Sequence, residues 1–198
     1  MLFRSRGLGS LGKQRQVRYV QGRGQFADAH TLHVRTADEV TSVTFDYAIV
    51  ATGSLPATPG ALRVDSPLVM DSTAALDLDD VPESLLVVGG GYIGLELGSV
   101  YAALGSRVTV VEMTNGLLPG ADRDLVEPLE KRLRTRFAEI LMETRVAKLE
   151  PIEGGVRATL ASTTLDNVER DFAKVLVAVG RVPNSRNLGD RKSTRLNS

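Results

Sequence analysis

The chain has 198 residues and a formal net charge of zero, with 24 Lys and Arg against 24 Asp and Glu, so neither nucleic acid nor an acidic membrane surface is implied as a partner. It contains no cysteine, which excludes disulfides, thiol chemistry and cysteine metal sites within these residues. With two histidines, it also has few side chains of the kind that bind transition metals. The apolar content of 42% is typical of globular proteins, and no apolar run is long enough to cross a membrane.

The N-terminal segment is basic, because Lys and Arg residues precede the first acid, Asp28. Such a bias occurs in transit peptides. The segment runs into a strand pattern without a cleavage-like break, so we interpret it as a solvated part of a larger domain.

Short alternating runs of apolar and polar residues follow at 17–28, 31–35 and 43–47, separated by polar turns. This pattern predicts an antiparallel β-meander. His30 and His33 fall within it, but residues three apart on a strand point to opposite faces, so we expect no metal site there.

An apolar strand is predicted over residues 47–54, and it ends in small residues where a ligand or another backbone can approach closely. Pro56, Pro59 and Gly60 then mark a linker. We therefore place a domain boundary between about Pro56 and Pro82.

A strand, a tight turn and a helix are predicted where residues 85–88 lead into three consecutive glycines and apolar positions at helical spacing follow as far as Gly105. Gly89, Gly91 and Gly94 have the G-x-G-x-x-G spacing of a dinucleotide-binding turn. In such a turn the first glycine permits the bend, the second admits a pyrophosphate and the third packs the helix on the strand. The N-terminus of that helix then faces the phosphates.

The next predicted strand, residues 107–111, ends in Glu112, close to the roughly 20-residue distance at which an acid binds the adenosine ribose hydroxyls. A structural turn with an unused glycine loop is the alternative, but strand, helix and acid in register favour dinucleotide binding. Glu112 would repel a 2′-phosphate, and no Lys or Arg occurs from Met113 to Asp122. We therefore expect NAD rather than NADP.

A helix is predicted over residues 122–136, with Asp122 as its cap and basic residues toward its end. Pro128 removes one backbone hydrogen bond, so we expect a kink or a later helix start. A strand at 139–143 follows.

A β-hairpin is predicted from the alternating runs 146–151 and 156–160, which flank a Glu-Gly-Gly turn, and a buried strand ends at Gly180. Parallel sheets bind ligands at the carboxyl ends of their strands. We therefore expect the strand ends at Gly89, Glu112 and Gly180 to meet at one crevice.

Together, four stretches resemble the pyridine nucleotide–disulfide oxidoreductase family, and their order and spacing is more specific than any one motif. They are residues 22–26, 51–54, 88–96 and 179–184. The resemblance covers about residues 16–189, and within the family the run from Leu95 to Leu125 is most similar to the dihydrolipoyl dehydrogenase branch. It implies an α/β fold, in which a Rossmann-like NAD-binding domain with a parallel sheet and a β-hairpin follows the β-meander of a truncated FAD-binding domain.

The resemblance also implies cofactor-binding residues. They are Gly24, Thr52 and Gly53 along FAD, and Gly89, Gly90, Gly91, Tyr92, Ile93, Gly94, Glu96, Glu112, Val146 and Gly180 along NAD. Tyr92, Ile93 and Glu96 match the helix start beside the nicotinamide, with core packing as the alternative for Tyr92 and Ile93. Val146 matches an apolar contact to adenine, and Gly180 a backbone contact to the nucleotide.

The sequence lacks the first FAD glycine loop of the family, its redox cysteine pair and its interface domain with a His–Glu pair. We therefore expect an internal fragment and assign no catalytic residue and no metal ligand. Residues 1–60 would end the first FAD-domain segment, 61–82 would form a linker, 83–183 would be the NAD-binding domain and 184–198 a truncated, non-native tail.

The resemblance implies a parent enzyme that passes electrons from dihydrolipoyl groups through a disulfide and FAD to NAD. We expect that parent to be a cytoplasmic homodimer, partnered by the lipoyl-bearing subunit of a 2-oxoacid dehydrogenase complex, and this chain alone to be inactive. The alternatives are another flavoprotein of the same fold, such as a glutathione or mercuric reductase or an NADH oxidase, and a non-catalytic NAD-binding module.

Overall fold

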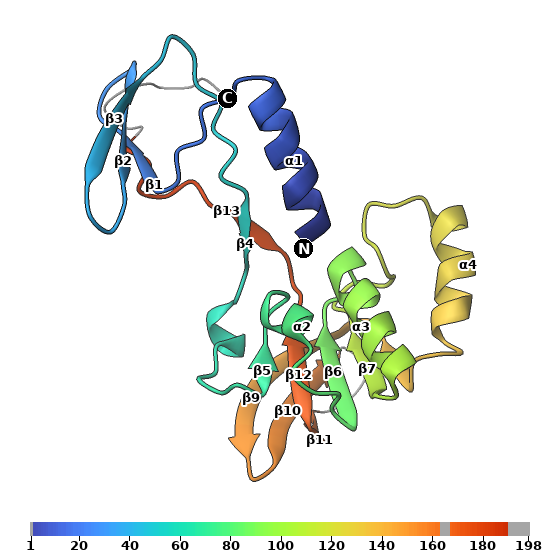
Figure 1. Cartoon of the computed structure of the whole chain (residues 1–198). Coiled ribbons are helices and arrows are strands. Elements are labelled where there is room, and N and C mark those ends of the chain that lie inside the picture. The colour runs from blue at the N-terminus through green and yellow to red at the C-terminus, as the bar shows by residue number, and fades with distance from the viewer. Residues whose placement is uncertain (1, 163–166, 190–198) are drawn as a thin grey trace. The chain divides into compact units, whose positions relative to one another are not determined.

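A computed structural model of the chain describes residues 2–162 and 167–189 (Figure 1). The chain divides into two compact units. The first comprises Met1–Gly53 together with Asn184–Ser198, and the second is Ser54–Pro183. Of the non-native tail predicted at 184–198, residues 190–198 lie outside the described residues.

The first unit contains helix α1 (Leu2–Gln14) and an antiparallel sheet in the order β1-β2-β3. Its strands are β1 (Arg23–Phe26), β2 (Thr31–Arg35) and β3 (Val40–Thr44), so the predicted meander is present. Phe26 and Phe45 pack edge to face, with their ring centroids 5.8 Å apart. Helix α1 was not predicted, because its three glycines weaken the helical signal of this segment.

The predicted strand at 47–54 is not formed before Ser54. Tyr47 and Ile49 are 94% and 95% exposed, and residues 47–53 have no regular secondary structure. A strand needs a neighbour for its backbone N–H and C=O groups. Within the described part of the chain, no strand pairs with this segment.

The second unit is built on a parallel sheet in the order β5-β12-β6-β7-β8. These strands are β5 (Val69–Met70), β12 (Lys174–Val177), β6 (Ser84–Val88), β7 (Arg107–Val111) and β8 (Glu139–Leu141). The central strands are near-continuous apolar runs because both faces of the sheet are covered. The prediction of a mixed α/β fold with a parallel sheet and antiparallel strands is confirmed.

Alternate side chains of β6 enter two different hydrophobic clusters. Leu85 and Val87 pack with residues of α3 (Tyr92–Leu104) and α4 (Arg123–Leu133). Leu86 and Val88 pack on the other face, against a second, antiparallel sheet. The unit therefore has three layers: helices, parallel sheet and antiparallel sheet.

The antiparallel sheet consists of β9 (Thr144–Ile152), β10 (Gly155–Ser162) and β11 (Val168–Phe172), in the order β11-β10-β9. The predicted hairpin is confirmed, and Gly154 supplies its turn with a φ of +75°. Strand β11 was not predicted, because its sequence, VERDF, is mostly charged.

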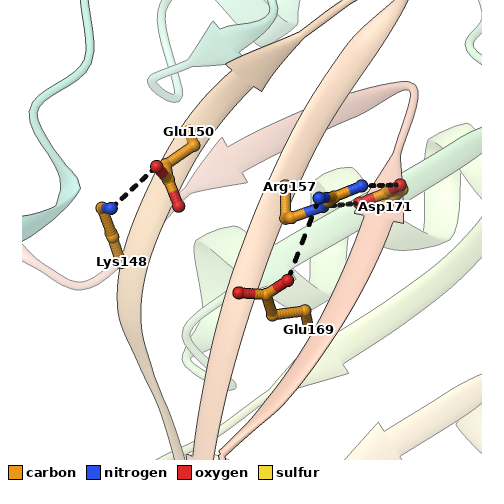
Figure 2. Close-up of polar contacts among 5 residues, drawn as sticks. All are labelled: Lys148, Glu150, Arg157, Glu169 and Asp171. Carbon is orange, nitrogen blue, oxygen red and sulfur yellow. Dashed lines mark hydrogen bonds and ion pairs between the residues drawn. The ribbon is translucent and has the colours of Figure 1, made fainter.

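Charged side chains on this sheet form ion pairs within and across its strands, as Figure 2 shows. Arg157 of β10 donates two hydrogen bonds to Asp171 of β11, at 2.7 and 2.9 Å, and also lies 3.9 Å from Glu169. Lys148 and Glu150 pair at 2.7 Å on β9. The Arg157 guanidinium holds the pKa of the Asp171 carboxyl below its usual value. Exposed pairs of this kind contribute little to stability, because water and salt screen the attraction between the charges.

The segment expected to be a linker, residues 61–82, instead contributes structure to the second unit. It includes most of the 3₁₀ helix η1 (Gly60–Leu62), strand β5 and helix α2 (Ala74–Asp77). Ala75 is fully buried, and its carbonyl accepts a 2.9 Å hydrogen bond from the Tyr101 hydroxyl of α3. Burial raises the pKa of that phenol. A short helical patch near residues 72–76 is visible in the sequence and overlaps α2, whereas the two-residue strand β5 is too short to leave a periodic signal.

Of the two outcomes expected from Pro128, a kink or a later helix start, the later start is wrong, because α4 starts at Arg123 and contains Pro128. The proline removes one backbone hydrogen bond. Val126 and Leu133 are each 3% exposed, and burial of side chains of this size contributes about 2 kcal/mol apiece. That burial offsets the missing bond.

Candidate functional site

A cleft of about 650 Å³ lies in the second unit, at the carboxyl ends of β6, β7 and β12. The three strand ends named from the sequence, Gly89, Glu112 and Gly180, all line it. Its other lining residues include Tyr92 and Ile93 at the start of α3.

Two glycines of the turn after β6 have no room for a side chain. Gly89 has a φ of +111°, and a Cβ there would lie 2.4 Å from the Ala178 carbonyl oxygen. A Cβ on Gly94 would lie 2.2 Å from the Gly89 carbonyl oxygen. The first glycine therefore permits the bend, and the third lets α3 pack directly on the turn.

Gly91 lies in a different environment. Among the described residues, no atom lies within 4 Å of the position its Cβ would take, and Gly91 lines the cleft at the N-cap of α3. The first N–H groups of a helix have no intrahelical acceptor, and the helix dipole is positive at this end. This part of the cleft therefore suits an anionic group such as a pyrophosphate.

The Glu112 carboxylate is 6% exposed and accepts hydrogen bonds at both oxygens. Oε2 accepts from the Gly90 amide at 2.7 Å, and Oε1 accepts from the Thr114 amide at 2.8 Å. The Thr114 hydroxyl lies 2.8 Å from Oε1 and 2.9 Å from the Gly116 carbonyl oxygen, and its single proton serves one of them at a time. An ionised carboxylate has about four acceptor positions, so Glu112 can still accept from a ligand hydroxyl.

Gly90 makes room for this carboxylate. A Cβ on Gly90 would lie 2.7 Å from Leu117 Cδ2 and 3.1 Å from Glu112 Oε2. Its carbonyl accepts a 2.9 Å hydrogen bond from the Leu118 amide. Gly90 therefore joins the turn after β6 to the loop after β7.

The pyridine nucleotide-disulphide oxidoreductase family model matches residues 5–197. The chain belongs to this family. The dihydrolipoyl dehydrogenase of Vibrio parahaemolyticus is 41% identical over 187 residues, which cover 94% of this chain and 39% of that enzyme. That of Haemophilus influenzae is 42% identical over 181 residues, 91% of this chain and 37% of the enzyme.

Two solved structures have the same fold as this chain. LpdA from Mycobacterium tuberculosis superposes with a TM-score of 0.87 at 27% identity, over 98% of this chain and 43% of its own. The Cu(II) complex of the HOCl-induced flavoprotein disulfide reductase RclA from Escherichia coli superposes with a TM-score of 0.83 at 26% identity. The match covers 96% of this chain and 42% of the RclA chain. The chain thus spans about two fifths of the length of the relatives it matches.

Three other residues predicted to bind NAD differ in their surroundings. Ile93 lines the cleft and also packs against the helix-side core, whereas Tyr92 is 63% exposed at the cleft. Glu96 is exposed on α3 and is not among the residues that line the cleft.

Val146 is 8% exposed, lines the cleft and belongs to the core on the antiparallel-sheet side. The Gly180 carbonyl accepts a 3.0 Å hydrogen bond from the Ala57 amide. Both residues line the cleft, Val146 from β9 and Gly180 from the segment that follows β12.

The residues matched to FAD lie in the first unit. Gly24 is in β1, opposite Val34 of β2. The Thr52 carbonyl accepts from the Asn184 side chain at 3.2 Å, and the Gly53 carbonyl accepts from the Asn184 amide at 2.9 Å. The second and fourth sequence motifs therefore meet at Asn184, which sequence reasoning did not single out as a site residue.

Two cations that line the cleft were also missed, Arg145 of β9 and Arg181. Arg181 begins β13 (Arg181–Pro183), which pairs with β4 (Ser54–Pro56). Arg145 lies next to Val146, and that adjacency is the only sequence signal that could have found it.

Across residues 2–162 and 167–189, no group of three or more His, Cys, Asp or Glu side chains is placed to hold a metal ion. The helices described there are too short or too polar to cross a membrane.

Proposed function

We propose that this chain is the NAD-binding domain and part of the FAD-binding domain of a dihydrolipoyl dehydrogenase. The observation that carries the proposal is the cleft in which the glycine turn at the start of α3 and the Glu112 carboxylate lie together. The 41–42% identity to dihydrolipoyl dehydrogenases over more than nine tenths of the chain supports the choice of enzyme.

In this proposal the NAD pyrophosphate lies over Gly91, at the N-terminus of α3. The free space at Gly91 and the positive end of the helix dipole support this position. Glu112 accepts from the adenosine ribose hydroxyls, Val146 contacts adenine and Gly180 contacts the nucleotide through its backbone. The nicotinamide end lies toward Tyr92, Ile93 and Glu96, with Gly89, Gly90 and Gly94 shaping the turn.

NAD is proposed rather than NADP because Glu112 combines low exposure with a negative charge. A 2′-phosphate beside this carboxylate would be repelled in a partly desolvated site, where charges interact more strongly than in water. The loop from Met113 to Asp122 contains no Lys or Arg to compensate for that repulsion.

FAD in the parent enzyme would supply the redox step between a disulfide and the nicotinamide. Gly24, Thr52 and Gly53 of this chain would lie along it. The hydrogen bonds from Asn184 to the Thr52 and Gly53 carbonyls support an ordered backbone at those two residues. The chain has no cysteine, so the disulfide would come from another part of the parent. We propose that residues 1–60 belong to the FAD-binding domain, 83–183 form the Rossmann-like NAD-binding domain, and the chain alone lacks dehydrogenase activity.

The parent would be a cytoplasmic homodimer that accepts electrons from the lipoyl-bearing subunit of a 2-oxoacid dehydrogenase complex. A second candidate is a flavoprotein disulfide reductase with another substrate. The structural similarity to RclA, at a TM-score of 0.83, favours this alternative over a non-catalytic NAD-binding module.

Calorimetric titration of the chain with NADH tests the proposal. Glu112→Lys should abolish or strongly weaken NADH binding, because it removes the ribose acceptor. Glu127→Lys is the matched control, since Glu127 is exposed on α4 and does not line the cleft. Glu112→Gln keeps the size of the side chain and removes only its charge, so a loss of NADH binding in this variant is not due to a loss of folding. NADH affinity that is unchanged in both Glu112 variants would contradict the proposal.

A further inference from the structure

Arg145 lies on β9 beside the loop that holds Glu112. The amide of the preceding residue, Thr144, donates a 3.0 Å hydrogen bond to the Glu112 carbonyl oxygen. The following residue, Val146, is buried in the wall of the cleft. The Arg145 side chain is exposed and lines the same cleft.

The Arg145 guanidinium is available to a ligand. Among the described residues, none forms a hydrogen bond or an ion pair with it. Arg181, the other cation of the lining, is held by Ser54 Oγ at 2.7 Å, by the Ser54 carbonyl at 2.6 Å and by Ser72 Oγ at 3.3 Å. The two arginines therefore differ, because Arg181 is fixed in the fold and Arg145 is not.

The position of Arg145 points to one end of a dinucleotide. The pyrophosphate position is at Gly91 and the ribose position at Glu112, so a group beyond Glu112 toward β9 is the adenine. Met113 also lines this part of the cleft and is 74% exposed. A guanidinium stacks on aromatic rings, and a thioether makes favourable contacts with them.

We propose that Arg145 is a further adenosine-binding residue, whose guanidinium stacks on the adenine ring of the dinucleotide. The proposal rests on the proposed NAD-binding function of the cleft. It assigns a role in affinity and none in the redox chemistry.

Calorimetric titration with ADP-ribose, which has the adenosine and both phosphates but no nicotinamide, tests this role. Arg145→Ala should raise the Kd about tenfold, within the range of a partly desolvated cation–π contact. Arg145→Lys keeps the charge but not the planar group, so it should recover little of the affinity. Arg132→Ala, which removes an exposed charge of α4 outside the cleft lining, should bind like the unmodified chain.

The salt dependence of the Kd distinguishes stacking of Arg145 on adenine from attraction of its charge to the phosphates. The effect of Arg145→Ala should persist between about 0.15 M and about 0.5 M NaCl, whereas attraction between exposed charges would be screened. The proposal would be overturned if Arg145→Ala left the Kd for ADP-ribose unchanged. It would also be overturned if Arg145→Lys restored the full affinity and the effect of Arg145→Ala disappeared at high salt. An unmodified chain that binds neither ADP-ribose nor NADH would overturn the proposed function as well.

Discussion

The Gly90 amide donates a 2.7 Å hydrogen bond to Oε2 of Glu112, which joins the turn after β6 to the residue after β7. The same carboxylate accepts from Thr114 through Oε1. Glu112 is therefore a structural acceptor within the cleft as well as the proposed acceptor for ribose. Substitutions around it should separate these two roles.

Gly94→Ala should destabilise the chain. Its Cβ would lie 2.2 Å from the Gly89 carbonyl oxygen, so the backbone of the turn or of α3 must shift. Overpacking of this kind costs about 1–3 kcal/mol, more than alanine gains over glycine in a helix. Urea denaturation measures the loss.

Gly98→Ala is the matched control on the same helix. Its Cβ would lie 3.4 Å or more from the nearest side-chain atoms, so the free energy of unfolding should be unchanged or slightly higher. Equal stability of Gly94→Ala and Gly98→Ala would contradict the close packing of α3 on the turn.

Gly91→Ala should fold normally but bind NADH more weakly. The φ of −77° suits any residue, and the Cβ meets no described atom within 4 Å, so stability should change by less than about 0.5 kcal/mol. The methyl group would occupy the proposed pyrophosphate position. Thermal unfolding checks the fold, and a calorimetric Kd equal to that of the unmodified chain would refute this position.

Thr114→Val should lower stability by about 1 kcal/mol, because it removes a hydroxyl that lies within hydrogen-bond distance of Glu112 Oε1 and of the Gly116 carbonyl. Thr114→Ser keeps the hydroxyl and should lose less. Urea denaturation of both variants measures the difference. A valine variant as stable as the serine variant would show that the hydroxyl bond contributes nothing.

Asp171 should contribute to acid sensitivity. Its pKa is lowered in the folded chain by the hydrogen bonds from Arg157, so its contribution is present at neutral pH and is lost as the pH falls through that lowered pKa. The thermal midpoint of the unmodified chain should fall more steeply below about pH 4 than that of Asp171→Asn. Glu127→Gln, which changes an exposed acid of α4, should follow the unmodified chain. Parallel curves for all three proteins would contradict the assigned pair.

The β6–turn–α3–β7 unit could be predicted from the sequence because its signals are local. The apolar strand, the glycine spacing and the helical periodicity all lie within about 30 consecutive residues, as in other βαβ units. The position of Glu112 followed from chain distance alone. Its hydrogen bonds to Gly90 and Thr114 could not be predicted, because they depend on how the loop after β7 folds back on the turn.

The predictions from sequence that were wrong or missing concern segments whose structure depends on residues far away in the chain. Strand β5 forms because two residues pair with β12, about 100 residues later in the chain. The segment 47–53 has the apolar pattern of a strand but no neighbour in the described residues to pair with. Arg145 carries no local motif, and only its neighbours in the folded chain mark it as a cleft residue.

Amide chemical shifts of the isotope-labelled chain, followed by NMR during titration with NADH, test the central claim most directly. Binding in the cleft predicts that the amides of Gly89, Gly91, Glu112 and Gly180 shift together, while those of α4's exposed face stay unchanged. A titration that saturates without moving these amides, or that produces no shift at millimolar NADH, would contradict the proposal that this cleft binds NAD.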